Sequence, residues 1–234
     1  MRIDFKKYLE DYEAATERVE YRRHGIFPSE GLVFVSFCRH HDVDIVIESG
    51  TCLGYSTEIF SRSLENTKIY TIDLNWSNEG TAILGEEHIA TRNKLNLLNN
   101  TEAIEGDSNQ EIPKLLKKYL NKKIAIFIDG PKGWRANRLA LECLKNKDVK
   151  FVGVHDHGPL SAEPDLDIGE IDVECYCTQS NQKYRYLDKR VADCEDCIVR
   201  KRRGTRHYTE VSYLKMYPKG PGLCIYYNDK IRNT

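Results

Sequence analysis

The chain has 234 residues, a length that suits one large domain or two small ones, and its single series of strand and helix signals favours one. Its 35 basic and 36 acidic side chains nearly cancel, so overall charge draws it toward neither nucleic acid nor a membrane surface. No segment approaches the roughly 20 consecutive apolar residues of a membrane span, and the first 20 residues lack the apolar run of a signal peptide. We therefore expect a cytoplasmic protein whose eight cysteines are reduced thiols or metal ligands rather than a disulfide framework.

Residues 1–42 are expected to form amino-terminal helices. Segment 3–23 carries apolar residues at helical spacing, which predicts an amphipathic helix. Pro28-Ser29-Glu30 has the composition of a helix start, and mainly apolar residues follow it. This second helix would lead the chain into the first strand.

The clearest local signal lies in residues 43–57, VDIVIESGTCLGYST. The β-branched run predicts a buried strand that ends near Glu48, then a turn with glycines at 50 and 54, then a helix from Tyr55. Open α/β sheets bind ligands at the carboxyl ends of their strands, and glycine lets the backbone approach a bound group. The GxxxG spacing differs from the dinucleotide fingerprint GxGxxG, which disfavours a dehydrogenase. An ordinary tight strand-to-helix turn is the structural alternative.

Four further predicted strands end at acidic side chains. They are 68–72 before Asp73, 102–105 before Gly106-Asp107, 123–128 before Asp129, and 150–154 before His155-Asp156-His157. Asp73 follows Glu48 by 25 residues (73 − 48), close to the roughly 20 expected for an acid that binds ribose hydroxyls. Ser108 and Glu111 have the pattern of a capping box, which gives Ser108 a structural role as the helix cap.

Alternating strands and helices predict a parallel sheet with helices on both faces. The runs 208–217 and 223–227 flank a Pro-Lys-Gly-Pro-Gly turn and predict an antiparallel hairpin at the sheet edge. The fold class is therefore α/β, a Rossmann-like doubly wound and mostly parallel seven-stranded sheet with a C-terminal antiparallel hairpin. Within one domain we expect, in order, 1–42 as amino-terminal helices, 43–157 as a cofactor-binding core, 158–206 as an acidic, cysteine-containing insertion or lid, and 207–234 as the hairpin that completes the sheet.

These motifs resemble those of the class I S-adenosylmethionine-dependent methyltransferases, and most of all the metal-dependent branch similar to catechol O-methyltransferase. The matching pieces lie within 43–157 and are ESGTCLGYS at 48–56, Asp73-Leu-Asn75, Gly106-Asp107-Ser108, Asp129-x-x-Lys132 and Asp156-His157. By this resemblance Glu48 and Gly50 would border the methionine part of the cofactor, Asp73 its ribose, and Asp107 with Ser108 its adenine. Tyr55, Ser56 and Asp129 are the other expected cofactor contacts.

The resemblance also implies a divalent metal held by Asp129, Asp156 and His157, with Lys132 as the general base and Asp129 as the second catalytic residue. His157 departs from that branch, which has asparagine there. A metal would lower the pKa of a substrate hydroxyl, and a nearby cation would depress the pKa of Lys132. Two carboxylates suit Mg²⁺, whereas an added imidazole favours Mn²⁺, Fe²⁺ or Zn²⁺. The structural alternatives are a turn at Asp129, a solvated lysine, and a hydrogen-bonded core histidine at His155.

Residues 158–206 lie outside the matching motifs. Their acidic run, from Glu163 to Glu174, predicts a solvated insertion that could fold over the cofactor as a lid. Two cysteine pairs fit a structural Cys₄ zinc site, with separate reduced thiols or disulfides as the alternatives: Cys175, Cys177, Cys194 and Cys197. Cys38, Cys52, Cys143 and Cys224 lie in apolar segments typical of a core. The basic run 200–206 indicates a solvated or internally paired face.

The function predicted from these patterns is methyl transfer from S-adenosylmethionine to a hydroxyl of a small molecule, with help from a divalent metal. One alternative is a metal-independent methyltransferase that uses Asp129 with His155 or His157 as acid and base. The other is a non-catalytic nucleotide- or zinc-binding interaction protein. The expected partner is a small hydroxylated substrate, with neither nucleic acid nor membrane, and a homodimer is left open.

Overall fold

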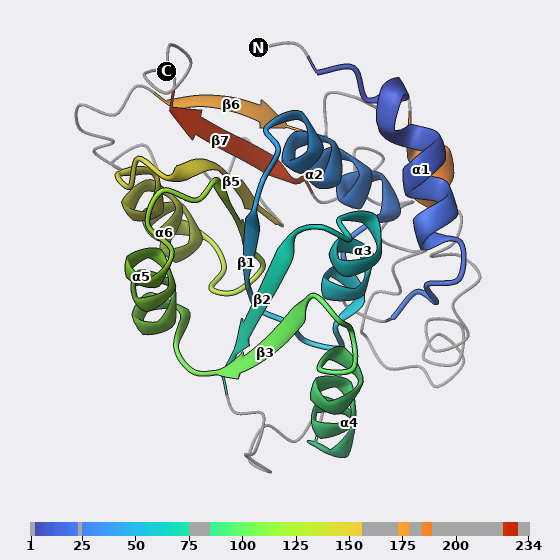
Figure 1. Ribbon diagram of the computed structural model, residues 1–234, viewed down its shortest axis with the longest axis horizontal. Helices are drawn as coiled ribbons and strands as arrows, with labels where there is room; N and C mark the ends of the chain where they lie inside the picture. The colour runs from blue at the N-terminus through green and yellow to red at the C-terminus, as the bar shows by residue number, and fades with distance from the viewer. Residues whose placement is uncertain are drawn as a thin grey trace.

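The computed structural model describes residues 3–22, 25–74, 85–155, 173–177, 184–188 and 222–228. Within these ranges seven strands form one sheet (Figure 1). The strands are β1 (Ile45–Ser49), β2 (Lys68–Asp73), β3 (Thr101–Glu105), β4 (Ile124–Ile128), β5 (Val149–Val154), β6 (Val173–Cys177) and β7 (Cys224–Asn228). The helices are α1 (Lys6–Thr16), α2 (Pro28–His40), α3 (Tyr55–Ser63), α4 (Gly85–Leu95), α5 (Ser108–Lys118) and α6 (Trp134–Leu144), with a short 3-10 helix at Arg185–Asp188. None of the helices in these ranges is long and apolar enough to cross a membrane.

The strand order is β3-β2-β1-β4-β5-β7-β6, and β1 to β5 run parallel. In register, Ser49 of β1 lies level with Ile72 of β2 and Ile128 of β4. The three central strands therefore end at the same edge of the sheet. The residues that follow them are brought together there, as in other open α/β sheets.

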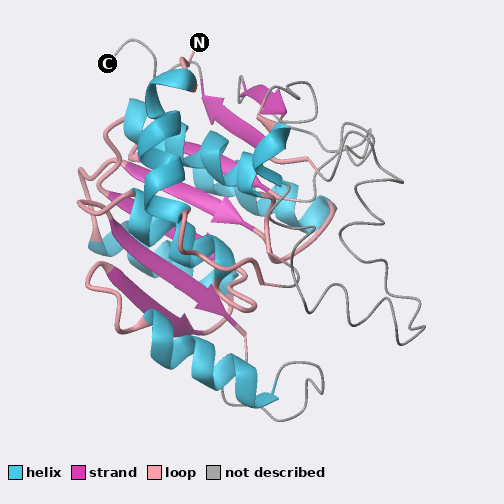
Figure 2. Cartoon of the chain, turned by 90° about the vertical axis from the view of Figure 1, so that its right-hand side faces the viewer, coloured by secondary structure: helices cyan, strands magenta, loops and turns pink. Residues whose placement is uncertain are grey.

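Both faces of the sheet are covered by helices, which Figure 2 shows packed against the strands. Strand β4, sequence IAIFI, is buried along its whole length because its side chains enter both layers. Phe127 joins the apolar cluster formed with α2 and α3, whereas Ile126 and Ile128 join the cluster formed with α5 and α6. The almost wholly apolar composition of this strand is thus explained, and the doubly wound prediction is confirmed.

The carboxyl-terminal edge is antiparallel, as predicted, but its strand pairing differs from the predicted hairpin. Strand β7 pairs antiparallel with β5 on one side and with β6 on the other. Strand β6 comes from residues 173–177, which the acidic composition predicted as a solvated insertion, while 208–217 lie outside the described residues. The alternation of Val173, Cys175 and Cys177 with Glu174 and Tyr176 has the period of a strand, and the surrounding acids concealed it.

The cysteines are not all in the predicted state. Cys38, Cys52 and Cys143 are free, and burial raises the pKa of the Cys143 thiol to about 12. Cys224 is buried as expected, but it is disulfide-bonded, which corrects the expectation that every thiol is reduced or bound to metal. Burial of a cysteine alone does not distinguish a thiol from a disulfide. Of the proposed zinc ligands, Cys175 and Cys177 lie on β6, whereas Cys194 and Cys197 fall outside the described residues.

Candidate functional site at the carboxyl edge of the sheet

A cavity of about 990 Å³ opens at the carboxyl edge of β1 to β4 and continues between α5 and α6. Its edge is formed by residues at the end of a strand or within three residues after one, from four strands: Gly50, Asp73, Asp107 with Ser108, and Gly130. Four of the eight residues predicted to contact a cofactor, Gly50, Asp73, Asp107 and Ser108, therefore lie around one space. Parallel strands of matched register account for this convergence.

Asp73 has one oxygen committed to the fold and one directed elsewhere. Its Oδ2 accepts the backbone N–H groups of Thr51 at 2.9 Å and Cys52 at 2.8 Å, which belong to the turn after β1. Within the described part of the chain, no hydrogen bond reaches its Oδ1. The side chain is 19% exposed and lines the cavity. Asp73 can thus hold the turn and still accept a hydrogen bond from a ligand hydroxyl.

The start of α5 differs from the predicted cap. Asp107, rather than Ser108, is the N-cap, and its carboxylate accepts the backbone N–H of Asn109 at 2.9 Å. Ser108 is the first helical residue, and its hydroxyl lies 2.6 Å from the hydroxyl of Ser49. Both residue types favour the cap position, so the sequence alone did not distinguish which of the two occupies it. Asp107 therefore has a structural role as well as its place in the cavity.

Glu48 lies beneath the cavity wall and is fully buried. The hydroxyls of Ser56 and Thr57 donate to its carboxylate, as does that of Thr71 at 2.6 Å. Burial raises the pKa of Glu48 to about 7, although the three hydroxyls act in the opposite direction. Three protein hydroxyls thus bind the carboxyl group, and its pKa lies above the usual value.

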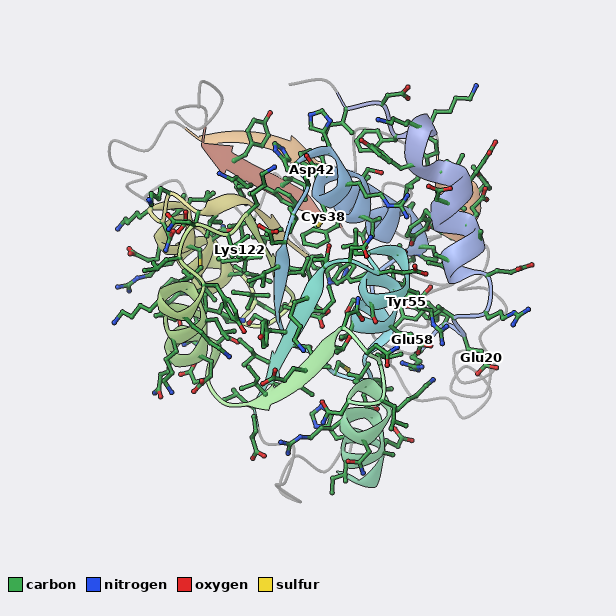
Figure 3. The ribbon with its side chains drawn as sticks, in the orientation of Figure 1. Glu20, Cys38, Asp42, Tyr55, Glu58 and Lys122 are labelled. Carbon is green, nitrogen blue, oxygen red and sulfur yellow. The ribbon has the colours of Figure 1, made fainter. Side chains whose placement is uncertain are left out.

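Tyr55 and Ser56, at the start of α3, are also placed behind the cavity. Tyr55, labelled in Figure 3, is at the start of this helix. It is 2% exposed, and its ring centroid lies 4.8 Å from that of Tyr21. Ser56 is buried against Glu48. Direct contact of Glu48, Tyr55 and Ser56 with a cofactor stays a prediction.

The buried acid gives a measurable pH dependence. The pKa of Glu48 rises from 4.5 to about 7 on folding, so its contribution to stability is fully present below pH 4.5 and is lost as the pH rises through 7. Glu48→Gln cannot titrate. The unfolding free energy of the wild type should therefore fall by about 3 kcal/mol relative to the variant between these pH values. Urea unfolding of both proteins across this range checks it, and parallel pH profiles would contradict it.

The two glycines of the turn are required by packing. Gly50 has φ +91°, and a Cβ placed on it would lie 2.6 Å from the backbone nitrogen of Gly130. A Cβ on Gly54, at φ +70°, would lie 2.9 Å from Leu95 of α4. The sequence predicted glycine for the approach of a ligand, whereas the structure supplies a nearer reason, the close approach of the chain after β4.

This reason can be tested with a matched pair of substitutions. Gly50→Ala should lower the free energy of unfolding by about 3 kcal/mol or more, because it combines a positive φ with a clash against backbone atoms. Gly133→Ala should cost less, about 2 kcal/mol, because its φ of +66° and ψ of −144° strain any residue with a Cβ, but nothing lies within 4 Å of the new Cβ. Chemical denaturation of the two variants measures the difference, and equal losses would refute the clash.

Beside Gly130 a chain of charged groups joins three elements. Asp129, after β4, has its Oδ1 2.6 Å from Nδ1 of His155 and also accepts a hydrogen bond from Lys132. On its other side, His155 Nε2 lies 3.2 Å from Oε2 of Glu30 in α2. Burial would raise the pKa of Asp129, but His155 and Lys132 outweigh it and hold that pKa well below its usual range. The chain alternates basic and acidic groups, which compensates buried charge.

Glu30 is the member of this chain that sequence reasoning missed. It is 2% exposed, and its Oε2 accepts the backbone N–H of Phe27 at 2.9 Å. In the sequence, a role at the start of the helix is a sufficient explanation for this acid. The mainly apolar run that follows Glu30 is the sequence signal that could have predicted its burial. His155, considered in the sequence as a hydrogen-bonded core residue, is 7% exposed and lies between two carboxylates.

The predicted metal ligands are only partly within the described ranges. Asp129 is described, whereas Asp156 and His157 lie outside. Among the residues that the structure describes, no three His, Cys, Asp or Glu side chains are grouped so that they could hold a metal ion. Lys132 is 51% exposed in its side chain and donates to Asp129, so in this arrangement it is the charge partner of the acid.

No family model matches the chain, and no curated protein matches it in sequence. Among solved structures, the O-methyltransferase TomG of Streptomyces achromogenes, in complex with SAM, is 14% identical over 97% of this chain and 92% of its own, with a TM-score of 0.50. An O-methyltransferase from Bacillus cereus in complex with SAH is 19% identical over 74% and 82%, with a TM-score of 0.47. The methyltransferase PaMTH1 of Podospora anserina, bound to SAH, is 13% identical over 95% and 87%, with a TM-score of 0.46.

At such low identity a structural likeness concerns the fold. TomG, over nearly the full length of both chains, shares with this protein a mostly parallel sheet flanked by helices. The chain has the Rossmann-like α/β fold of the class I S-adenosylmethionine-dependent methyltransferases.

Proposed function

We propose that the protein is an S-adenosylmethionine-dependent methyltransferase that transfers the methyl group to a hydroxyl of a small molecule. The observation that carries the proposal is the placement of Asp73 and Asp107 with Gly50 around one cavity at the carboxyl edge. Asp73 Oδ1 would accept a hydrogen bond from a ribose hydroxyl. Asp107 lies just after the neighbouring strand β3, where the adenine is expected. TomG, whose fold is similar, was crystallised with the same cofactor.

Methyl transfer from a sulfonium requires two things of the protein, the correct position of the acceptor oxygen and a group that accepts its proton. The methyl group of a sulfonium is already activated, so the enzyme must hold the acceptor oxygen in line with it and accept the hydroxyl proton. Asp129 directly precedes Gly130, which lines the cavity, and its side chain is 11% exposed. This position supports a role for its carboxylate as the group that accepts a hydrogen bond from an acceptor hydroxyl.

Two routes for the proton follow from the candidate residues. A divalent metal on Asp129, Asp156 and His157 would bind the hydroxyl and lower its pKa, and Lys132 would accept the proton. Alternatively, Asp129 and His155 would take the proton themselves. Both routes leave only Oδ2 of Asp129 for a ligand, because its Oδ1 already accepts from His155 and Lys132.

The proposal is tested by incubating the purified protein with SAM and a panel of phenols, catechols and aliphatic alcohols, and by measuring SAH and methylated product by mass spectrometry. We expect acceptor-dependent SAH formation. Activity that survives treatment with EDTA supports the route through Asp129 and His155. Activity that EDTA removes and Mg²⁺ or Mn²⁺ restores supports the metal route. A protein that binds neither SAM nor SAH would instead be an interaction module.

A further inference from the structure

The cavity wall carries acids and cations on different elements. Its acidic residues at the strand edge are Asp73 and Asp107. The helices α5 and α6 supply four cations, spread from the first turn of α6 to the carboxyl ends of both helices: Lys117, Arg135, Arg138 and Lys145. A sulfonium nucleoside suits the acidic strand ends, where its cationic sulfur and ribose hydroxyls meet carboxylates. The helical wall therefore suits a ligand of the opposite charge.

Three of these cations have no carboxylate to balance them. Within the described ranges, Lys117 of α5 and Arg135 and Arg138 of α6 make no ion pair. The acid on this wall, Glu142, is already engaged by Lys145 at 2.7 Å. Arg135 and Arg138 are three residues apart on α6 and so project from neighbouring positions on the same side of the helix. Paired guanidinium groups bind the oxygens of phosphate and carboxylate in a fork geometry.

The floor between the two helices is apolar. Ile112, Leu116 and Leu139 line the cavity and are buried, and they belong to the core cluster beneath α5 and α6. Trp134 at its mouth is 43% exposed, although large aromatic side chains usually bury most of their surface, and the Arg135 guanidinium lies 5.5 Å from its ring centroid. An exposed ring beside unbalanced cations offers stacking area next to charge.

The volume leaves room for a second molecule. At about 990 Å³ the cavity is at the upper end of the range for sites that enclose one drug-sized ligand, roughly 300 to 1,000 Å³. We propose that the stretch between α5 and α6 is a second ligand site that binds a small amphipathic anion beside the cofactor. Its apolar body lies on Leu139 and Trp134, and its phosphate or carboxylate lies between Arg135 and Arg138. The site depends on the cavity and its charges, and not on the proposed reaction.

Calorimetric titration at low salt tests the site with 1-naphthyl phosphate and 1-naphthoate as probes. The comparison ligands are 1-naphthol, which has the aromatic body without the anionic group, and inorganic phosphate, which has the anionic group without the aromatic body. We expect at least one of the two anionic probes to bind at least 10-fold more tightly than either comparison ligand, and the stronger probe identifies the anion. Naphthol binding as tightly as both probes, or inorganic phosphate doing so, would overturn the proposal.

A double substitution, Arg135→Gln with Arg138→Gln, should weaken binding of the stronger probe at least 10-fold. The matched control is Lys6→Gln with Lys7→Gln, which removes two exposed cations from α1 and should change the affinity less than 2-fold. All these side chains are exposed, so the variants should unfold at the wild-type temperature. An equal loss in the control pair would show that net charge, and not this site, attracts the probe.

A further titration is made with saturating SAH. The proposal predicts that the probe still binds, within about 3-fold of its affinity for the free protein. Complete displacement of the probe by SAH would contradict it, since the cations would then belong to the cofactor's own site. Binding of the probe without binding of SAH would refute the proposed function and support this second site. Binding of SAH without binding of the probe would refute the second site and support the proposed function.

Discussion

Asp73→Ala is expected to weaken SAH binding by about 10- to 100-fold. The substitution removes Oδ1, a hydrogen-bond acceptor on a side chain that lines the cavity, and a hydrogen bond to a charged group contributes about 1.5–3 kcal/mol. It also frees the backbone N–H groups of Thr51 and Cys52, which Oδ2 now holds, so the turn after β1 loses its brace. Isothermal titration calorimetry with SAH gives the two dissociation constants directly.

The neighbouring strand supplies a matched control for this result. Glu105 pairs in register with Asp73 across the β2–β3 ladder, and its Oε2 lies 3.5 Å from Nη1 of Arg92. Glu105 does not line the cavity. Glu105→Ala removes the same charge from the same end of the sheet and should leave SAH affinity within about 2-fold. If both variants lose affinity equally, the effect is one of overall charge, and Asp73 does not contact the cofactor.

Asp129→Ala should have the opposite pattern, with turnover reduced at least 100-fold and SAH affinity retained within about 3-fold. Both proposed routes for the acceptor proton depend on this carboxylate, whereas Asp73 and Asp107 would hold the nucleoside. Substitution also leaves Lys132 and His155 without their shared acceptor, so stability should fall as well. SAH release in the presence of the best acceptor measures turnover, and calorimetry measures affinity.

Asp129→Asn separates the chemical role from the structural one. The amide oxygen still accepts a hydrogen bond, so more of the fold's stability should return than with alanine, but the negative charge that draws the proton is gone. Low turnover in both variants with normal SAH affinity supports the assignment. Equal loss of cofactor affinity in Asp73→Ala and Asp129→Ala would show that the acceptor side of the cavity has been misplaced.

The core of the fold could be predicted because its signals are local and repeated. An apolar run such as 124–128 is long enough for a strand and too short for most helices, and each such run ends at a glycine or an acid. Parallel pairing then brings the strand ends to one edge whatever their separation in sequence. The sequence alone therefore predicts that Gly50, Asp73 and Asp107 lie at one edge of the sheet, and all three line the cavity there.

What the sequence concealed depends on contacts between distant segments. Glu30 satisfies a helix start locally, and only the fold brings it to His155. Gly50 was interpreted through a ligand because the approach of Gly130, 80 residues later (130 − 50), leaves no local trace. Strand β6 is specified by its pairing with β7 more than by its own composition.

Titration of the wild-type protein with SAH tests whether the carboxyl edge of this sheet binds a sulfonium nucleoside. We expect saturable binding of SAH at one site, with a dissociation constant in the micromolar range, and no binding of NAD under the same conditions. Absence of heat with SAH and SAM, confirmed by an unchanged unfolding temperature in their presence, would contradict it.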